Sequence, residues 1–164
     1  EKLPSKMVKT NAVILGKRFT FFTDNGVFSK DGLDFGSRLL LETIPLEEVG
    51  GKVLDMGCGY GVFGITLNKI LSCSVDMVDV NLRALHLSEI NAKENKCSNV
   101  RIFESFTYSN VDSKYTTIIT NPPIRAGKKV VYDRTAPARV YSTVRVDKTE
   151  YNENGTKYYY VKKG

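Results

Sequence analysis

The chain has few of the residues that build metal sites and disulfide frameworks. Its 164 residues include three cysteines, Cys58, Cys73 and Cys97, and no two of them are spaced as CxxC. An odd and scattered set of cysteines disfavours both a disulfide scaffold and a structural zinc site. We therefore expect a protein of a reducing, cytoplasmic compartment with no bound metal. The single histidine, His86, lies within a predicted helix, where a surface position is a better interpretation than a catalytic base.

Long hydrophobic runs are absent as well. The longest apolar stretches, residues 68–75 and 115–119, fall far short of the roughly 18 residues that a membrane-spanning helix requires. No basic segment followed by an apolar core opens the chain, so no export signal is predicted. The sequence also contains no internal repeat and no low-complexity tract. We expect no association with a membrane.

The composition is that of an ordinary globular domain. Hydrophobic residues make up 41% of the chain and charged residues 26%, which argues against a disordered, collagen-like or coiled-coil protein. A chain of this length has room for one hydrophobic core. We predict a single domain over residues 1–164, divided into an aromatic and basic N-terminal segment (1–32), a cofactor-binding and catalytic core (33–133) and C-terminal edge strands (134–164).

The net charge of +6 is unevenly distributed along the chain. Residues 1–30 carry a net +4, residues 31–121 a net −4, and residues 122–164 a net +6. Basic flanks on either side of an acidic centre would suit a polyanionic partner. Solvated surface lysines account for the charge equally well, so the charge pattern alone does not decide between these interpretations.

The most regular hydrophobic pattern lies between Gly51 and Pro123, where short β-branched runs alternate with longer segments of helix-forming residues. This pattern predicts strands over residues 52–54, 74–79, 100–103 and 115–120 and helices over 62–71 and 82–96. Strands that alternate with helices form parallel sheets with right-handed crossovers. We therefore predict an α/β fold with a Rossmann-like, doubly wound, mostly parallel sheet.

Weaker patterns flank this region. Residues 34–44 predict a helix that covers one face of the sheet. Residues 18–28 are rich in aromatic residues and predict a β-hairpin that turns at Asp24-Asn25-Gly26. An antiparallel edge pair at the C-terminus is predicted by three features, namely the alternation over 140–146, the turn signal Asn154-Gly155 and the run 156–161.

A glycine-rich turn follows the first strand of the regular pattern. Residues 59–64 match G-x-G-x-x-G, and Asp79 follows about twenty residues later, as in dinucleotide-binding proteins. Asp55, however, places a carboxylate just before the glycines, where it would repel a diphosphate and attract a cation. S-adenosylmethionine carries a sulfonium and an ammonium group, so it fits this arrangement better than NAD does. Asp79 would then accept hydrogen bonds from the ribose hydroxyls. A turn that serves only close helix–strand packing is the alternative.

A second motif, Thr120-Asn121-Pro122-Pro123-Ile124, ends the last strand of the pattern. The prolines stiffen the backbone and remove two N–H donors, which leaves Asn121 Oδ1 and the Pro122 carbonyl as a pair of acceptors. Such a pair can accept both hydrogens of an exocyclic amine and turn its lone pair toward a methyl donor. Because Asn-Pro starts many turns, a plain strand stop is the alternative. The glycine turn, Asp79 and Asn121 all follow predicted strands, so we expect them at one edge of the sheet.

These motifs resemble those of a known family. Residues 55–61 and Val78-Asp79-Val80-Asn81 resemble the cofactor motifs of class I S-adenosylmethionine-dependent methyltransferases. Three further segments are similar to motifs of the RsmC-type branch of this class. They are residues 121–128, Gly26-Val27-Phe28-Ser29 and residues 33–37. Enzymes of that branch methylate guanine N2 in bacterial small-subunit ribosomal RNA.

The resemblance covers roughly residues 10–133 and implies a role for each motif. It implies cofactor contacts from Asp55, Gly57, Cys58, Gly59, Tyr60, Gly61, Asp79, Val80, Asn81, Ser105, Phe106 and Asn121. It implies that the target amine is held by Asn121, Pro122, Pro123 and Ile124. It also implies that the RNA backbone is approached by Arg125, Lys128 and Lys129. The implied cofactor is S-adenosylmethionine, and the implied partner is ribosomal RNA or the small ribosomal subunit, bound by a monomer or a weak dimer.

The sequence departs from the family in two places. The family carries a Ser-Asp pair after the third strand, whereas this chain reads Glu104-Ser105-Phe106, so the adenine ring would meet Phe106 or a backbone group. In addition, only 41 residues follow Pro123, about thirty fewer than the family's remaining elements need. We expect that the segment from Arg134 onward is not directly continuous with the core, and an intact mass near 18.4 kDa would contradict this.

Several functions are compatible with these motifs. We favour methyl transfer to an exocyclic amine, with guanine N2 of small-subunit ribosomal RNA as the substrate. Enzymes that methylate adenine N6 or a protein glutamine N5 are the nearest alternatives, but they carry an aromatic residue where this chain has Ile124. A non-catalytic RNA-binding or cofactor-binding protein is an alternative of another class. An NAD-dependent oxidoreductase is disfavoured by Asp55.

Overall fold

A computed structural model describes residues 7–24, 33–120, 139–143 and 157–160 of the chain. In these residues the chain forms a two-stranded sheet and a six-stranded sheet. None of the helices among the described residues has the length and apolar character needed to cross a membrane.

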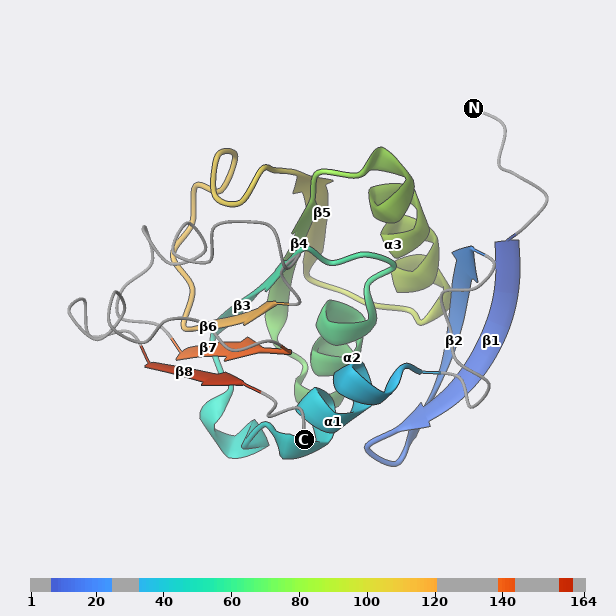
Figure 1. The fold of residues 1–164 in the computed structure, drawn as a ribbon, viewed down its shortest axis with the longest axis horizontal. Helices are drawn as coiled ribbons and strands as arrows, with labels where there is room; N and C mark the ends of the chain where they lie inside the picture. Colours follow the sequence, from blue (N-terminus) through green and yellow to red (C-terminus); the bar gives the residue numbers. More distant parts are fainter. Residues whose placement is uncertain (1–6, 25–32, 121–138, 144–156, 161–164) are drawn as a thin grey trace.

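The larger sheet is the framework of the molecule (Figure 1). Its strands are β3 (Lys52–Met56), β4 (Ser74–Asp79), β5 (Val100–Glu104), β6 (Thr117–Thr120), β7 (Arg139–Ser142) and β8 (Lys157–Tyr160). They lie in the order β5-β4-β3-β6-β7-β8, and every neighbouring pair runs parallel. The strand order reverses between β3 and β6, and open α/β sheets bind ligands beyond the carboxyl ends of the strands at such a point. The predicted Rossmann-like, parallel fold is confirmed.

Three helices cover one face of this sheet, on the right of it in Figure 1. They are α1 (Phe35–Thr43), α2 (Val62–Leu71) and α3 (Leu82–Glu94), and a short 3₁₀ helix, η1 (Leu46–Glu48), precedes β3. Two of the helices begin at side-chain caps. Asp34 accepts a hydrogen bond from the Ser37 amide at 3.2 Å, and Asn81 accepts bonds from the Arg83 and Ala84 amides at 2.8 and 3.3 Å. These caps satisfy amides that have no partner within their helix.

Alternate residues of the strands fill two separate cores. The core beneath the helices includes Val53, Val75, Met77, Ile119 and Tyr141. The opposite face contributes Leu54, Met56, Val78, Ile118 and Val140, which pack with Tyr108 and Tyr115 from the segment between β5 and β6. Burial on both faces explains why the sequences of these strands are nearly continuous apolar runs.

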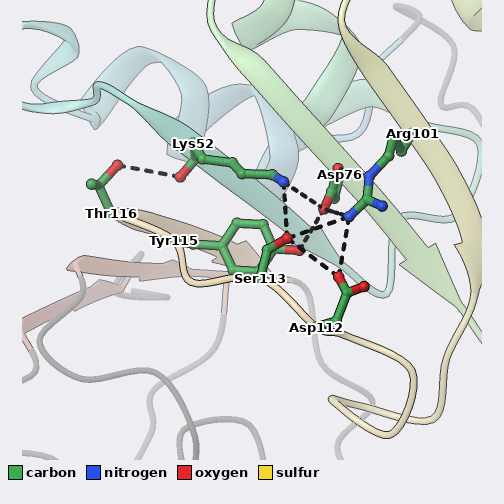
Figure 2. Close-up of polar contacts among 7 residues, drawn as sticks. All are labelled: Lys52, Asp76, Arg101, Asp112, Ser113, Tyr115 and Thr116. Carbon is green, nitrogen blue, oxygen red and sulfur yellow. Dashed lines mark hydrogen bonds and ion pairs between the residues drawn. The ribbon is translucent and has the colours of Figure 1, made fainter.

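A charged network crosses the second face of the sheet (Figure 2). Asp76 is 1% exposed and pairs in register with Arg101 on β5. Arg101 donates to both carboxylate oxygens of Asp76 at 3.0 and 2.8 Å, and the Tyr115 hydroxyl donates to Oδ2 at 2.5 Å. Lys52 Nζ lies 3.5 Å from the same Oδ2 atom. The network ties β3, β4 and β5 to the segment that leads into β6.

The two-stranded sheet is an N-terminal hairpin of β1 (Met7–Ile14) and β2 (Lys17–Asp24). Part of the segment predicted as a hairpin, residues 18–24, does form a hairpin strand, but its partner is β1 and the strands turn at Leu15-Gly16, before that segment. The predicted turn at Asp24-Asn25-Gly26 falls partly on residues outside the described part of the chain and stays a prediction. Leu15 and Gly16 have φ angles of 51° and 79°, and two residues of positive φ give the turn type whose twist suits a two-residue hairpin. Residues 25–32 lie outside the described part of the chain.

The C-terminal edge of the large sheet also differs from the prediction. β7 and β8 pair in parallel, with Arg139 opposite Lys157 and Ser142 opposite Tyr160, so the predicted antiparallel direction was wrong. Parallel neighbours require a crossover of about a dozen residues or more, and the stretch between Ser142 and Lys157 is long enough to provide one. The predicted turn residues Asn154 and Gly155 lie outside the described residues, and β7 ends well before them.

Candidate functional site

A tight glycine turn connects β3 to α2 at the carboxyl edge of the sheet. The amides of Gly57 and Cys58 both donate to the Val78 carbonyl at 2.9 Å, and the Gly61 amide donates to the Cys58 carbonyl at 2.8 Å. Gly61, which caps α2, has a φ of 99°, a conformation that residues with a Cβ rarely adopt. The turn is therefore held against the end of β4, the neighbouring strand.

The last glycine of the motif, Gly64, has a different role. A Cβ atom at this position would lie 2.6 Å from Met77 Sδ on β4 and 3.1 Å from Asp55 Oδ2. Gly64 therefore allows α2 to pack closely on the sheet. This is the role that the alternative interpretation, a turn serving only helix–strand packing, assigned to the whole glycine motif. Gly61 is close-packed too, since a Cβ there would lie 2.9 Å from Ile65 Cδ1 and 3.2 Å from Ser88 Oγ, whereas a Cβ at Gly59 would meet nothing within 4 Å.

Asp79 lies at the end of β4 and supports the turn from the side. Its Oδ2 atom accepts a hydrogen bond from the Gly59 amide at 2.9 Å, and its Oδ1 atom accepts one from the Asn81 amide at 3.0 Å. The Asp79 side chain is not buried, and each carboxylate oxygen has a second lone pair. Asp79 thus retains the capacity to accept hydrogen bonds from a ligand's hydroxyl groups.

Asp55 lies beneath the turn and is fully buried. Its Oδ2 atom accepts a hydrogen bond from the Gly64 amide at 2.8 Å, while its Oδ1 atom has no hydrogen-bond partner among the described residues. Burial raises the pKa of Asp55 to about 7, an effect that the Gly64 bond opposes and the nearby Asp79 charge reinforces. Because Asp55 has no exposed surface, it can favour a nearby cation through its charge, without direct contact with a ligand.

The pKa of Asp55 predicts a specific dependence of stability on pH. A carboxyl group with a folded pKa of about 7 and an unfolded pKa near 3.8 stabilises the fold fully below pH 3.8, and this contribution is lost as the pH rises through 7. Asp55→Asn removes this titration. We expect the free energy of unfolding of the variant, relative to the wild type, to rise by about 2–3 kcal/mol between pH 5 and pH 8. Urea unfolding of both proteins at the two pH values measures this difference, and parallel pH profiles would contradict it.

Two further residues hold the turn from α3, and the sequence analysis missed both. Ser88 Oγ donates to the Gly59 carbonyl at 2.7 Å, and Asn91 Nδ2 donates to the Tyr60 carbonyl at 2.8 Å. Both side chains are buried. Polar residues three positions apart on the apolar face of the 82–96 helix were the available signal, because buried polar groups require partners.

The other predicted cofactor residues gather around the same edge. Cys58 is buried with its Sγ atom 3.4 Å from Ser88 Oγ, so its side chain packs in the interior, and burial raises its pKa. The Tyr60 ring makes an edge contact with Phe21 of the hairpin at a centroid distance of 5.7 Å. Val80, which follows β4, is 55% exposed.

The segment after β5 presents the predicted residues Ser105 and Phe106. The Ser105 amide donates to the Asp79 carbonyl at 3.0 Å, and its hydroxyl donates to the Thr107 carbonyl at 2.7 Å. These bonds fix the loop beside the end of β4. Phe106 is 67% exposed, so an apolar ring faces solvent at this edge of the sheet.

The predicted acceptor pair and basic residues lie outside the described part of the chain. They are Asn121, Pro122, Pro123, Ile124, Arg125, Lys128 and Lys129. Their nearest described neighbour is Thr120, the last residue of β6, which pairs in register with Met56 at the end of β3. The roles of these residues therefore stay predictions.

Elsewhere, a cavity of about 530 Å³ lies between the hairpin and the C-terminal end of α3. Its lining includes Arg18, Phe19, Asn95 and Lys96, and it contains none of the predicted site residues. No residue of the glycine turn lines this cavity, so the cavity and the candidate site are separate. Among the described residues there is no group of three or more His, Cys, Asp or Glu side chains arranged to hold a metal ion.

The fold is that of class I methyltransferases. The model of the methyltransferase small domain family matches residues 18–148, and the chain belongs to this family. The predicted resemblance is thereby confirmed.

Individual relatives support the same assignment. The uncharacterized protein YbxB of Bacillus subtilis is 53% identical over 119 residues, which cover 71% of this chain and 59% of YbxB. Ribosomal RNA small subunit methyltransferase C of Vibrio parahaemolyticus is 40% identical over 127 residues, which cover 76% of this chain and 36% of that protein. The chain therefore spans less than two thirds of the length of these relatives.

A solved structure shares the fold. It is the T. thermophilus 16S rRNA N2 G1207 methyltransferase RsmC in complex with AdoMet and guanosine. The match has a TM-score of 0.65 and 30% sequence identity, and it covers 77% of this chain and 36% of that one.

Proposed function

We propose that the chain binds S-adenosylmethionine and transfers its methyl group to an exocyclic amine, with guanine N2 of small-subunit ribosomal RNA as the substrate. The observation that carries this proposal is the glycine turn between two carboxylates, one of which, Asp55, has a buried oxygen with no partner among the described residues. Carboxylates on either side of the turn oppose a dinucleotide's phosphates and favour a cationic ligand. The residues present therefore fit S-adenosylmethionine.

The relatives support the choice of substrate. RsmC of T. thermophilus was solved with both AdoMet and guanosine, and its fold matches most of this chain. The Vibrio relative is named as a methyltransferase of small-subunit ribosomal RNA. Such a substrate predicts a cytoplasmic protein, and the basic segments 1–30 and 122–164 supply charge for contact with RNA.

Each predicted residue then has a defined task. Asp79 accepts hydrogen bonds from the ribose hydroxyls, while Val80 and the exposed Phe106 ring contact the adenine. When bound, S-adenosylmethionine would supply an electrophilic methyl group and leave as S-adenosylhomocysteine, and the methylated amine would release one proton to solvent. Asn121 Oδ1 and the Pro122 carbonyl accept the two amine hydrogens and orient the nitrogen lone pair, so positioning dominates catalysis.

Transfer of a radiolabelled methyl group tests this function. The purified protein is incubated with labelled S-adenosylmethionine and with small ribosomal subunits, deproteinised RNA or a protein fraction, and the labelled product is digested to nucleosides. We expect label in N2-methylguanosine. The substrate that accepts it tells whether the protein acts on free RNA or on an assembled subunit.

Each alternative function predicts a different outcome of this experiment. Label in N6-methyladenosine or in protein glutamine would overturn the proposed substrate and keep the chemistry. Binding of S-adenosylmethionine without any transfer would support the non-catalytic alternative. A protein that does not bind S-adenosylmethionine at all would refute the proposed function as a whole.

A further inference from the structure

The N-terminal hairpin is attached to α3 by two asparagine side chains. Asn95 Oδ1 accepts a hydrogen bond from the Thr20 amide at 3.0 Å, and its Nδ2 donates to the Thr20 carbonyl at 2.8 Å. Asn91 repeats this pattern on Phe22, with distances of 2.6 Å from the Phe22 amide and 2.9 Å to its carbonyl. Each side-chain amide therefore pairs with one residue of β2 as a neighbouring strand would.

The spacing of the two asparagines explains why both can pair. Four residues of an α-helix rise about 6 Å, and two residues of a β-strand rise about 6.6–6.8 Å. The spacing of residues 91 and 95 along α3 is thus close to the spacing of residues 22 and 20 along β2. The backbone N–H and C=O groups of residues 20 and 22 point to the same edge of the hairpin. The two amides cover that edge with hydrogen bonds in place of another strand.

Asn91 differs from Asn95 in one contact. The Nδ2 group of Asn91 also donates to the Tyr60 carbonyl at 2.8 Å, whereas the corresponding bond of Asn95 goes to the Asn91 carbonyl of the same helix. The Asn91 side chain is fully buried, and its amide group bonds both to the hairpin and to the glycine turn. The Tyr60 ring meets Phe21 of the hairpin as well.

The Tyr60 carbonyl belongs to the peptide that leads into Gly61. The Tyr60–Gly61 peptide and the preceding Gly59–Tyr60 peptide each contain a glycine. Because glycine has few steric limits on its backbone angles, the chain itself restricts the orientation of these two peptides only weakly. Within the turn, the Gly61 amide of the Tyr60–Gly61 peptide donates to the Cys58 carbonyl at 2.8 Å, and bonds from outside the turn hold the remaining polar groups. Asp79 holds the Gly59 amide, Ser88 holds the Gly59 carbonyl, and Asn91 holds the Tyr60 carbonyl.

We propose that Asn91 is a positioning residue for the cofactor turn, through which docking of the N-terminal hairpin fixes the orientation of the Tyr60–Gly61 peptide. The hairpin is then part of the support of the cofactor site, although it lies on the outer side of the helices. This inference rests on the proposed function, because it concerns the affinity for S-adenosylmethionine. The reciprocal effect follows, since a ligand that stabilises the turn must also stabilise the hairpin's attachment.

Matched variants separate positioning from stability. Asn91→Asp and Asn95→Asp preserve side-chain shape, and each removes two donated hydrogen bonds, but only the first removes a bond to the turn. Calorimetric titration with S-adenosylmethionine, well below both melting temperatures, should show about tenfold weaker binding for Asn91→Asp and less than about twofold for Asn95→Asp. Comparable losses of affinity in the two variants would overturn the inference. Asn91→Ala and Asn95→Ala provide a second pair.

Hydrogen exchange of the wild-type chain tests the reciprocal effect without any variant. S-adenosylmethionine should slow exchange of the Phe22 amide, which donates to Asn91, more than that of the Thr20 amide, which donates to Asn95. Equal protection of the two amides would count against Asn91. If the wild type fails to bind S-adenosylmethionine, the proposed function fails, whereas wild-type binding with indistinguishable variants refutes the positioning role alone.

Discussion

Replacing Asn121 with alanine is expected to lower the rate of methyl transfer at saturating substrates by about tenfold or more and to leave the affinity for S-adenosylmethionine nearly unchanged. The side-chain oxygen is predicted to accept one amine hydrogen, so its loss leaves the nitrogen lone pair unaligned with the methyl group. The predicted interactions with the cofactor's ribose and cationic groups come from Asp79 and Asp55 at the glycine turn, so cofactor binding should persist. Single-turnover rates and calorimetric titration provide the two measurements.

The control for this variant is Asn11→Ala. Asn11 is an exposed asparagine on β1 whose described hydrogen bond comes from the Thr20 hydroxyl, so its substitution should change neither quantity. A loss of cofactor affinity equal to the loss of rate would show that Asn121 supports the cofactor instead of the amine. An unchanged rate would remove Asn121 from the chemistry and leave the plain strand stop as its role.

The central part of the fold could be predicted because its signals are local. The helix over 62–71 and the strand over 74–79 have the predicted boundaries, since glycine, apolar periodicity and an acidic strand end mark them within a few residues. The turn of the hairpin could not be found in this way. Leu15 adopts a positive φ that leucine rarely takes, and no turn-forming residue precedes Gly16. The direction of β8 depends on pairing with a distant strand, which alternation does not encode.

The candidate site was predictable to a similar degree. Asp55 and Asp79 could be placed because the residues after parallel strands meet at one edge, and the structure brings both to the glycine turn. Ser88 and Asn91 were missed because their partners are backbone carbonyls about thirty residues away. Every residue has a backbone carbonyl, so the sequence does not indicate which one accepts a bond. The hairpin's contact with the turn is invisible for the same reason.

Asp76 was also missed as a determinant of stability, although a carboxylate in the middle of an apolar strand signals a need for partners. Burial alone would raise its pKa, but hydrogen bonds from Arg101 and Tyr115 and the charges of Lys52 and Arg101 outweigh burial and lower it. A group with a lowered pKa stabilises the fold above its unfolded value of 3.8, and this contribution is lost as the pH falls through the folded pKa. The network in Figure 2 therefore stabilises the protein at neutral pH.

Arg101→Met is expected to lower the free energy of unfolding at pH 7.5 by about 3 kcal/mol and the melting temperature by about 6–12 °C. This loss of stability lies at the lower end of the range for buried ion pairs that lose one partner, because the Arg101 side chain is 52% exposed and Lys52 stays near Asp76. Without Arg101, the pKa of Asp76 rises, because a hydrogen-bond donor and a nearby cation that lower it are lost. The destabilisation should therefore be smaller at pH 4.5 than at pH 7.5, because proton binding to Asp76 offsets part of the loss.

Urea unfolding at pH 4.5 and 7.5 measures this difference, and the contribution of Asp55 cancels because both proteins contain it. The double variant Asp76→Asn/Arg101→Met supplies the control, since it removes the buried charge together with its partner and should recover part of the lost stability. A destabilisation that is equal at both pH values would mean that Arg101 acts through packing of its side chain over Phe103, whose ring centroid lies 5.3 Å from the guanidinium carbon. Full additivity of the two substitutions would lead to the same conclusion, because independent effects leave no coupling energy between the charges.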